Sequence, residues 1–266
     1  MASVTVNGIS VHHQVHGEPG APWVLNIGGS GGDLRQTLPE RSPLNRSFRV
    51  LSYDQRGLGQ TDKPDHVHEM SHYADDAAEL VREVVGGPCG VVGTSFGGMV
   101  ALHLALRHPD LVERMALLCT SPGGDHASYP LHTLADLDPD ERFRVRMGLM
   151  DERWDPDADE PIPDLGPVYD VLVAQSAATP GADAERGARH QLDARSRHDV
   201  VDRLGEITCP TLVCAGRYDR TAPLENAELL AERIPDARLE VFEGGHLLMF
   251  QDRRVFPAVI DFLTPT

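Results

Sequence analysis

Lysine is nearly absent from this sequence, and long apolar runs are missing altogether. Lys63 is the only lysine among 24 basic residues, and we attribute this bias to GC-rich codon usage. The 41 acidic residues leave a formal net charge of −17. An acidic surface repels the phosphate backbone, so we expect no nucleic-acid partner. No stretch reaches the length of apolar sequence that a membrane span requires, so we expect no membrane partner.

The N-terminus and the cysteines bear on cellular location. Residues 1–15 alternate apolar and polar side chains and lack the basic and apolar regions of a signal peptide. The four cysteines have no CxxC spacing, and three of them lie in apolar strand-like runs: Cys89, Cys119, Cys209 and Cys214. We interpret them as reduced residues and predict a cytoplasmic protein.

Strand-like and helix-like segments alternate over most of the 266 residues. The strand-like runs are 4–6, 11–15, 23–27, 49–53, 89–93, 115–119, 211–215 and 238–242, and the middle ones are nearly all apolar. Helical periodicity follows at 73–84, after a possible cap at Ser71, and at 99–107, 224–234 and 255–263. This alternation predicts an α/β fold with a doubly wound, mostly parallel sheet of eight strands.

One segment interrupts the alternation and carries prolines, acidic residues and helix-forming stretches instead of strands. Asp138 supplies a helix N-cap, Pro139 suits the first helical position, and Glu141 follows at the third. We therefore predict a core domain of residues 1–122 and 206–266 with a helical cap, residues 123–205, inserted over the carboxyl ends of the strands.

A GxSxG motif places Ser95 between an apolar strand and a helix. The motif runs from Gly93 to Gly97, and small neighbours let a serine occupy a sharp strand-to-helix turn. Such a turn exposes the hydroxyl beside a helix N-terminus, where the backbone N–H of Phe96 can face a developing oxyanion. Ser30 also lies in a GxSxG match, but only a weak helix follows it. We predict that Ser95 is the nucleophile and retain Ser30 as the alternative.

A serine hydroxyl needs a base, and the base needs an orienting acid. His246 follows the strand at 238–242 on a glycine-rich loop, and Asp219 comes just after the strand at 211–215. Three such residues at three strand ends predict a catalytic triad of Ser95, Asp219 and His246. Asp125, which follows another strand, is the alternative acid.

These motifs resemble those of α/β-hydrolase-fold serine hydrolases over nearly the whole chain outside the predicted cap. The order Ser95, Asp219, His246 matches that family. The segment from Tyr53 to Thr61 is similar to the family's DxRGxGxS segment, in which the positions of Asp54 and Arg56 are usually structural. The resemblance is strongest to the branch of 3-oxoadipate enol-lactonases and small carboxylesterases.

The resemblance also implies an oxyanion hole in the early glycine-rich loop. The family commonly has His-Gly before its oxyanion-hole residue, whereas Gly28 and Gly29 precede Ser30 here. We expect the backbone N–H groups of Ser30 and Phe96 to form the hole, with Gly29 as an alternative donor. The glycine run lacks the features of a P-loop and the GxGxxG spacing, so we expect no cofactor.

Two further patterns concern metal and substrate. His68, Glu69 and His72 match HExxH, with His66 nearby, but a helix beginning after Ser71 would not hold both histidines on one face, so we expect no metal site. Within the cap, Met147, Trp154 and Tyr169 are candidates for lining a substrate pocket, although packing in an apolar core explains each of them equally well.

The expected function is hydrolysis of a carboxylic ester or lactone of a small apolar or cyclic substrate through an acyl-enzyme. The same triad also supports carbon–carbon bond hydrolysis, thioester cleavage or intramolecular acyl transfer, and these reactions remain alternatives. A non-catalytic ligand-binding module of the same fold is a second alternative, against which an intact triad argues.

Overall fold

The computed structural model describes residues 2–177 and 181–264. Within them, one sheet contains eight strands in the order β1-β2-β4-β3-β5-β6-β7-β8. The strands are β1 (Ala2–Val6), β2 (Ile9–His16), β3 (Trp23–Ile27), β4 (Arg49–Tyr53), β5 (Cys89–Thr94), β6 (Val112–Leu118), β7 (Thr211–Gly216) and β8 (Ala237–Phe242). Only β1 with β2 and β2 with β4 pair antiparallel. The predicted doubly wound, mostly parallel sheet is confirmed.

Each of the eight predicted strand segments lies within an observed strand or extends one residue beyond it. The central strands are buried on both faces, which is why they read as continuous apolar runs. Neighbouring residues show the two faces, since Val91 belongs to one apolar cluster and Val92 to another. Successive side chains of a strand point to opposite sides of a sheet, so the two clusters are the two halves of the core.

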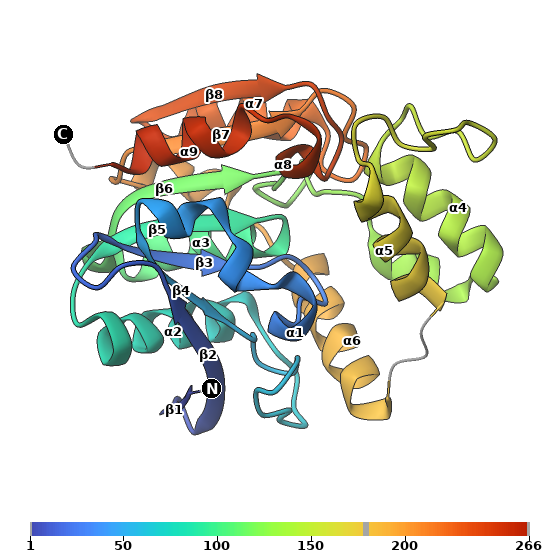
Figure 1. The fold of residues 1–266 in the computed structure, drawn as a ribbon. Coiled ribbons are helices and arrows are strands. Elements are labelled where there is room, and N and C mark those ends of the chain that lie inside the picture. The colour runs from blue at the N-terminus through green and yellow to red at the C-terminus, as the bar shows by residue number, and fades with distance from the viewer. Residues whose placement is uncertain (1, 178–180, 265–266) are drawn as a thin grey trace.

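Helices cover both faces of the sheet (Figure 1). One cluster contains residues of α2 (Met70–Leu80), α3 (Phe96–Arg107) and α7 (Leu224–Arg233). The other contains residues of α8 (Leu248–Gln251) and α9 (Val255–Leu263). A short helix, α1 (Leu34–Thr37), follows β3.

The start of α2 corrects one prediction. Ser71 is not the cap, because Glu69 caps a helix that already begins at Met70. The Glu69 side chain accepts the backbone N–H of His72, and the Nδ1 atom of His72 accepts the backbone N–H of Glu69 at 3.0 Å. This reciprocal pair is a capping box in which a histidine takes the place usual for glutamate or glutamine.

Between β6 and β7 the chain forms α4 (Pro139–Met150), α5 (Pro167–Ala177) and α6 (Ala182–Ser196). Asp138 caps α4 as predicted, accepting the backbone N–H groups of Asp140 and Glu141 at 3.0 and 3.1 Å. The arrowheads of β6 and β8 point toward α4 and α5 (Figure 1). We refer to residues 123–205 as the cap, and these boundaries stay a prediction.

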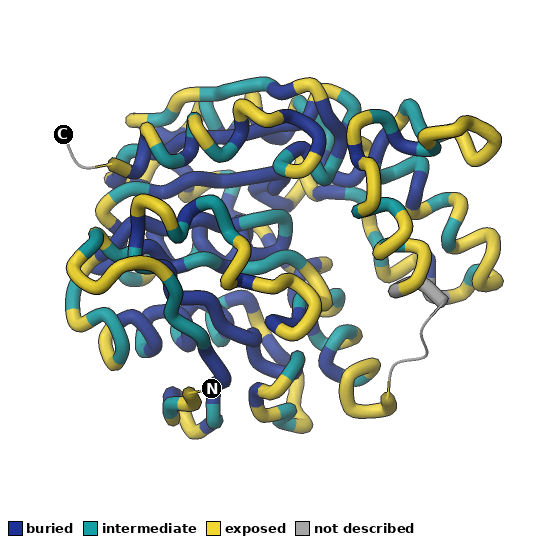
Figure 2. The backbone as a smooth tube through the Cα atoms, in the orientation of Figure 1, coloured by how far each residue is buried: buried dark blue, intermediate teal, exposed yellow. Residues whose placement is uncertain are grey.

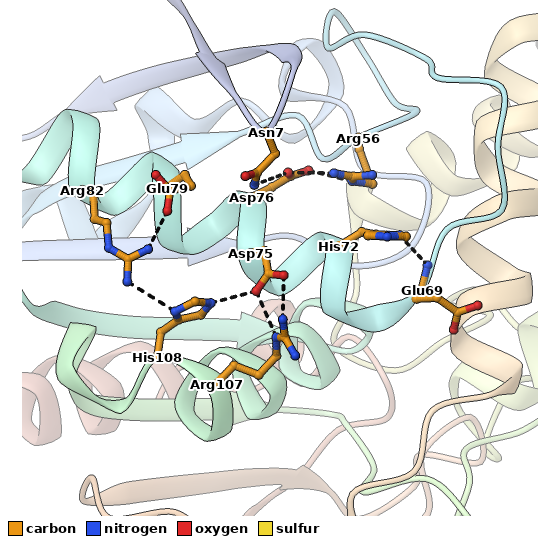
Figure 3. A network of polar contacts seen from close by, with 10 residues as sticks. All are labelled: Asn7, Arg56, Glu69, His72, Asp75, Asp76, Glu79, Arg82, Arg107 and His108. Carbon is orange, nitrogen blue, oxygen red and sulfur yellow. Dashed lines mark hydrogen bonds and ion pairs between the residues drawn. The ribbon is translucent and has the colours of Figure 1, made fainter.

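The segment that resembles the family's DxRGxGxS motif makes hydrogen bonds to several other parts of the core. The carboxylate of Asp54 accepts the backbone N–H groups of Leu34 and Gln60 at 2.7 and 2.9 Å. The Arg56 guanidinium makes two hydrogen bonds to Asp76, at 2.7 and 2.8 Å, and Asn7 adds a third bond to that carboxylate (Figure 3). Across residues 2–177 and 181–264, no helix is both long and apolar enough to cross a bilayer.

Candidate active site

Ser95 lies at the sharp turn between β5 and α3. Its backbone angles are φ 53° and ψ −115°, a strained conformation for a residue other than glycine. The turn is held because the Ser95 N–H donates to the Leu118 carbonyl at 2.8 Å and the Thr120 hydroxyl donates to the Ser95 carbonyl at 2.7 Å. Hydrogen bonds to β6 and to the residues that follow it therefore hold Ser95 in this strained conformation.

The glycines of the GxSxG motif are required by close backbone approach. A Cβ atom on Gly97 would lie 2.1 Å from the Ile27 carbonyl oxygen, and one on Gly93 would lie 2.5 Å from the Gly97 oxygen. Both distances are too short for any side chain. The motif thus lets α3 pass directly beside the end of β3, where the early glycine-rich loop begins.

His246 links Ser95 to Asp219. The Nε2 atom of His246 is 3.0 Å from the Ser95 Oγ, and its Nδ1 atom donates to Asp219 Oδ2 at 2.7 Å. The other carboxylate oxygen of Asp219 accepts the N–H groups of Thr221 and Ala222 at 2.8 and 2.9 Å. The structure therefore brings the three residues of the predicted triad into one hydrogen-bonded chain.

The alternative nucleophile, Ser30, and the alternative acid, Asp125, take no part in these hydrogen bonds. Ser30 is exposed, and the histidine bonds Ser95 instead. Asp125 is also exposed, and the carboxylate bonded to His246 is that of Asp219. The sequence predicted Asp219 from its position after a strand and left Asp125 as the alternative, because the bond to His246 is a contact between residues far apart in the sequence.

The early glycine-rich loop lies against Ser95, and Gly29 is the residue at the contact. A Cβ atom built on Gly29 would be 3.7 Å from the Cβ atom of Ser95. Phe96 begins α3, where the first backbone N–H groups have no partner within the helix. This arrangement favours Gly29 as strongly as Ser30 for the second oxyanion donor beside Phe96.

Two buried glutamines hold this loop, and neither was singled out from the sequence. Gln55 donates to the Gly28 carbonyl at 2.8 Å, and Gln191 of α6 accepts the Gly31 N–H at 2.7 Å. Gln55 stands within the DxRGxGxS-like segment, so the motif was a signal that could have found it. For Gln191 the sequence offers no such signal.

A third glutamine, Gln251, links the loop that carries His246 to the cap by hydrogen bonds. Gln251 accepts the Gly245 N–H at 2.9 Å and donates to Asp151 at 2.8 Å and to the Pro163 carbonyl at 2.9 Å. The N–H of His246 itself donates to the Met150 carbonyl at 2.6 Å. The end of α4 thus contributes directly to the position of the histidine.

The three residues named for a substrate pocket pack in one apolar cluster of the cap. Met147 is 1 % exposed, and Trp154 and Tyr169 are partly buried against it. Leu247, next to His246, joins the same cluster. Their contacts are those expected for packing, and lining a pocket stays a prediction.

The histidines of the HExxH match lie around the start of α2, where the His66 ring packs edge-on against His68 and His72, with ring centroids 5.2 and 5.8 Å apart. His68 precedes α2, Glu69 caps it and His72 lies in its first turn. Among the described residues, one group has donor atoms within 4.8 Å of one another, namely Cys119, Asp219 and His246. Burial and the Asp219 carboxylate raise the pKa of the Cys119 thiol well above its usual value. In this group the His246 ring and the Asp219 carboxylate are bonded to each other at 2.7 Å, so their facing atoms are already paired.

Comparisons with known proteins identify the family of this chain. The model of the alpha/beta hydrolase family matches residues 15–258. The chain belongs to the alpha/beta hydrolase family. It is a hydrolase, and its fold is that of the family.

Individual relatives are more distant. The chain is 29 % identical to a protein of Rhizobium rhizogenes assigned as the carbamate hydrolase RutD, over 88 % of this chain and 90 % of that one. It is 27 % identical to a poly(3-hydroxyalkanoate) depolymerase of Ectopseudomonas oleovorans, over 93 % and 86 %. The enol-lactonase of Burkholderia xenovorans LB400 superimposes with a TM-score of 0.81 at 24 % identity, covering 99 % of this chain and 100 % of that one.

Proposed function

We propose that this chain cleaves a carboxylic ester or lactone of a small apolar or cyclic substrate, with Ser95 as nucleophile. The observation that carries the proposal is the hydrogen-bonded chain from Ser95 through His246 to Asp219 at a strained turn. Strained backbone persists where surrounding contacts enforce it, and it is concentrated at active sites.

Acylation follows from these distances. The Ser95 Oγ attacks the carbonyl carbon while its proton moves to His246 Nε2, 3.0 Å away. The carbonyl oxygen becomes an oxyanion that the N–H of Phe96 and an N–H of Gly29 or Ser30 stabilise. The intermediate then collapses, the bond to the leaving alkoxide breaks, and His246 returns the proton to that oxygen.

Deacylation uses the same groups. A water molecule gives a proton to His246 and attacks the acyl carbon, and the Ser95 oxygen leaves with that proton. Asp219 holds the ring through Nδ1, so Nε2 faces the serine and the imidazolium is stabilised in both steps. No step requires a group from outside the chain other than substrate and water.

The relatives support an acyl carbon bonded to oxygen or nitrogen. By their names, two curated relatives act on a carbamate and on a polyester. In each of these substrates a carbonyl carbon carries a heteroatom leaving group, which fits acyl transfer to Ser95. We propose an ester or lactone because the oxygen leaving group needs the least assistance.

A fluorophosphonate tests the proposal by covalent reaction with an activated serine. We expect intact-mass measurement to show one adduct on the wild-type protein and on the Ser30→Ala control. Ser95→Ala should carry none and should keep its far-UV circular dichroism spectrum. An adduct that persists on Ser95→Ala, or a folded wild-type protein that never reacts, would refute Ser95 as the nucleophile.

A further inference from the structure

A small cavity lies where the cap meets the core, separate from the Ser95 hydroxyl. Its volume is about 70 Å³. The walls are formed by α3, by the segment that follows β6 and by the end of α6, and they include Met99, Ser121, Ser128, His132, Arg195 and His198. A single water needs roughly 10–15 Å³ of such space, so this cavity has room for a small polar group.

Arg195 enters this cavity as a buried charge without a counterion. The residue is 6 % exposed, and its Nε atom is buried with no hydrogen-bond partner. No acidic side chain in the described parts of the chain forms an ion pair with it, and burial lowers its pKa to about 10. Arginine is rarely buried without a partner, because an uncompensated charge in the interior is costly.

The Ser128 hydroxyl lies beside Arg195 and is bonded to it. Ser128 Oγ accepts from the Arg195 guanidinium at 2.7 Å and from the Ser121 hydroxyl at 3.3 Å. This contact occupies one end of the guanidinium, and the Nε–H of Arg195 still has no acceptor. A ligand that accepts hydrogen bonds would satisfy it.

His198, the buried histidine of this cavity, neither adds charge nor supplies an acceptor. His198 Nε2 donates to the Ser121 carbonyl at 3.0 Å, and its Nδ1 is paired with His103 Nε2 at 3.1 Å. Burial lowers the pKa of His198 to about 3, so its ring is neutral at physiological pH. Arg195 therefore carries a single positive charge that one negative charge would balance.

We propose that this cavity binds the carboxylate group of a small organic acid. A carboxylate is planar and carries one charge, and it accepts paired hydrogen bonds from the fork of a guanidinium. A phosphate dianion would leave one negative charge unbalanced inside the protein. The site involves neither Ser95 nor His246, so the proposal does not depend on the reaction proposed above.

The cavity shares structural elements with the candidate active site. Met99 lies one turn of α3 beyond Ser95, and Ser121 follows Thr120, which bonds the Ser95 carbonyl. Gln191, one turn before Arg195 on α6, bonds the glycine-rich loop at Gly31. The carboxylate therefore has two plausible sources, the acidic end of a substrate or a separate small acid.

Thermal unfolding in acetate tests the site. Replacing chloride by 100 mM acetate at constant ionic strength should raise the Tm of the wild-type protein by about 2–4 °C. Arg195→Met should show no rise. Arg189→Met, which removes an exposed arginine of the same helix, should respond like the wild type. Equal Tm values in acetate and chloride for the wild type, or an undiminished rise in Arg195→Met, would overturn the proposal.

A purely structural role for Arg195 makes a different prediction. If Arg195 only supported Ser128, Arg195→Met would lower the Tm in chloride and leave the wild type insensitive to acetate. On our proposal the Tm of Arg195→Met in chloride stays close to that of the wild type, because the substitution removes an uncompensated charge. Ser128→Ala, which keeps the charge, should reduce the acetate response and serves if Arg195→Met fails to fold.

Calorimetry on Ser95→Ala protein separates the two sources without turnover. Monomethyl succinate that binds at least tenfold more tightly than acetate, together with no binding of dimethyl succinate, assigns the carboxylate to a substrate. Equal affinities for acetate and the half-ester assign it to a separate acid. In both cases, adding Arg195→Met should abolish binding. If neither acetate nor monomethyl succinate binds, the proposed site is refuted.

Discussion

Two helices of equal length show how differently the core and the cap are built. Both α3 and α4 contain 12 residues, but nine residues of α3 are buried and Met147 is the one buried residue of α4. Figure 2 shows the same contrast, with buried central strands in the core and an α4 of mixed exposed and intermediate residues in the cap. Packing against its neighbours stabilises α3, whereas α4 depends more on the hydrogen bonds of its own N-cap, Asp138.

The contrast implies that the core contributes more than the cap to the stability of the protein. Packing in the core tolerates little change, because its interior is dense and its backbone approaches are close. The cap has a small apolar cluster of its own and also places Ala194, Val200 and Leu204 in the main core cluster. Polar contacts join the two parts as well, through Gln191 of the cap and Gln251 of the core. We therefore expect core substitutions to have large effects and cap substitutions small ones, except at those contacts.

The largest difference should separate the two candidate acids. Asp219→Asn favours the wrong tautomer of His246, so we expect kcat to fall by about 10⁴-fold. Asp125→Asn in the cap should leave kcat nearly unchanged, since Asp125 is exposed and His246 is bonded to Asp219. Steady-state ester hydrolysis by the two variants measures this, and a greater loss in Asp125→Asn would reassign the acid.

Buried and exposed ion pairs extend the comparison to stability. The Arg56 and Asp76 side chains are 5 % and 2 % exposed, so Asp76→Asn leaves a buried charge unpaired and should cost about 3–5 kcal/mol of unfolding free energy. In the cap, Asp183 pairs with Arg186 but is 69 % exposed. Asp183→Asn should cost less than about 1 kcal/mol. Urea unfolding gives both values. Similar losses of unfolding free energy in the two variants would contradict the proposed difference between core and cap.

A methyl group added to a core glycine should also be destabilising. In Gly97→Ala the new Cβ atom would lie 2.1 Å from the Ile27 carbonyl oxygen, which forces the backbone apart. We expect a loss of about 3 kcal/mol and a loss of reaction with fluorophosphonate, because the turn and the glycine-rich loop move. Normal labelling of a stable Gly97→Ala protein would show that the close approach is dispensable.

The same substitution in the cap should have the smallest effect, with the opposite sign. Gly148 lies in α4, where the nearest atom to an added Cβ is 4.0 Å away on Trp154. Gly148→Ala should raise the unfolding free energy by about 0.5–1 kcal/mol, because alanine favours the helix. Urea unfolding tests this, and a destabilised Gly148→Ala would mean that α4 is packed more tightly than its exposure indicates.

Local features of the sequence were sufficient for most of the fold. Apolar runs located the central strands, because strands buried on both faces need no polar side chains. Asp138 and Pro139 located the start of α4 through their own hydrogen bonding and fixed φ. The prediction failed at the start of α2, where Glu69 and His72 form an unusual capping box that no propensity for Ser71 revealed.

The sequence by itself determined the strand order along the chain, the serine at a tight turn and a short set of candidate acids and bases, since each depends on neighbouring residues. Only the tertiary structure decided that His246 bonds Asp219, that Gly29 lies against Ser95, and that Arg195 is buried without a counterion. These facts depend on distances between residues far apart in the sequence. Such distances exist only once the sheet, the glycine-rich loop and α6 have packed together.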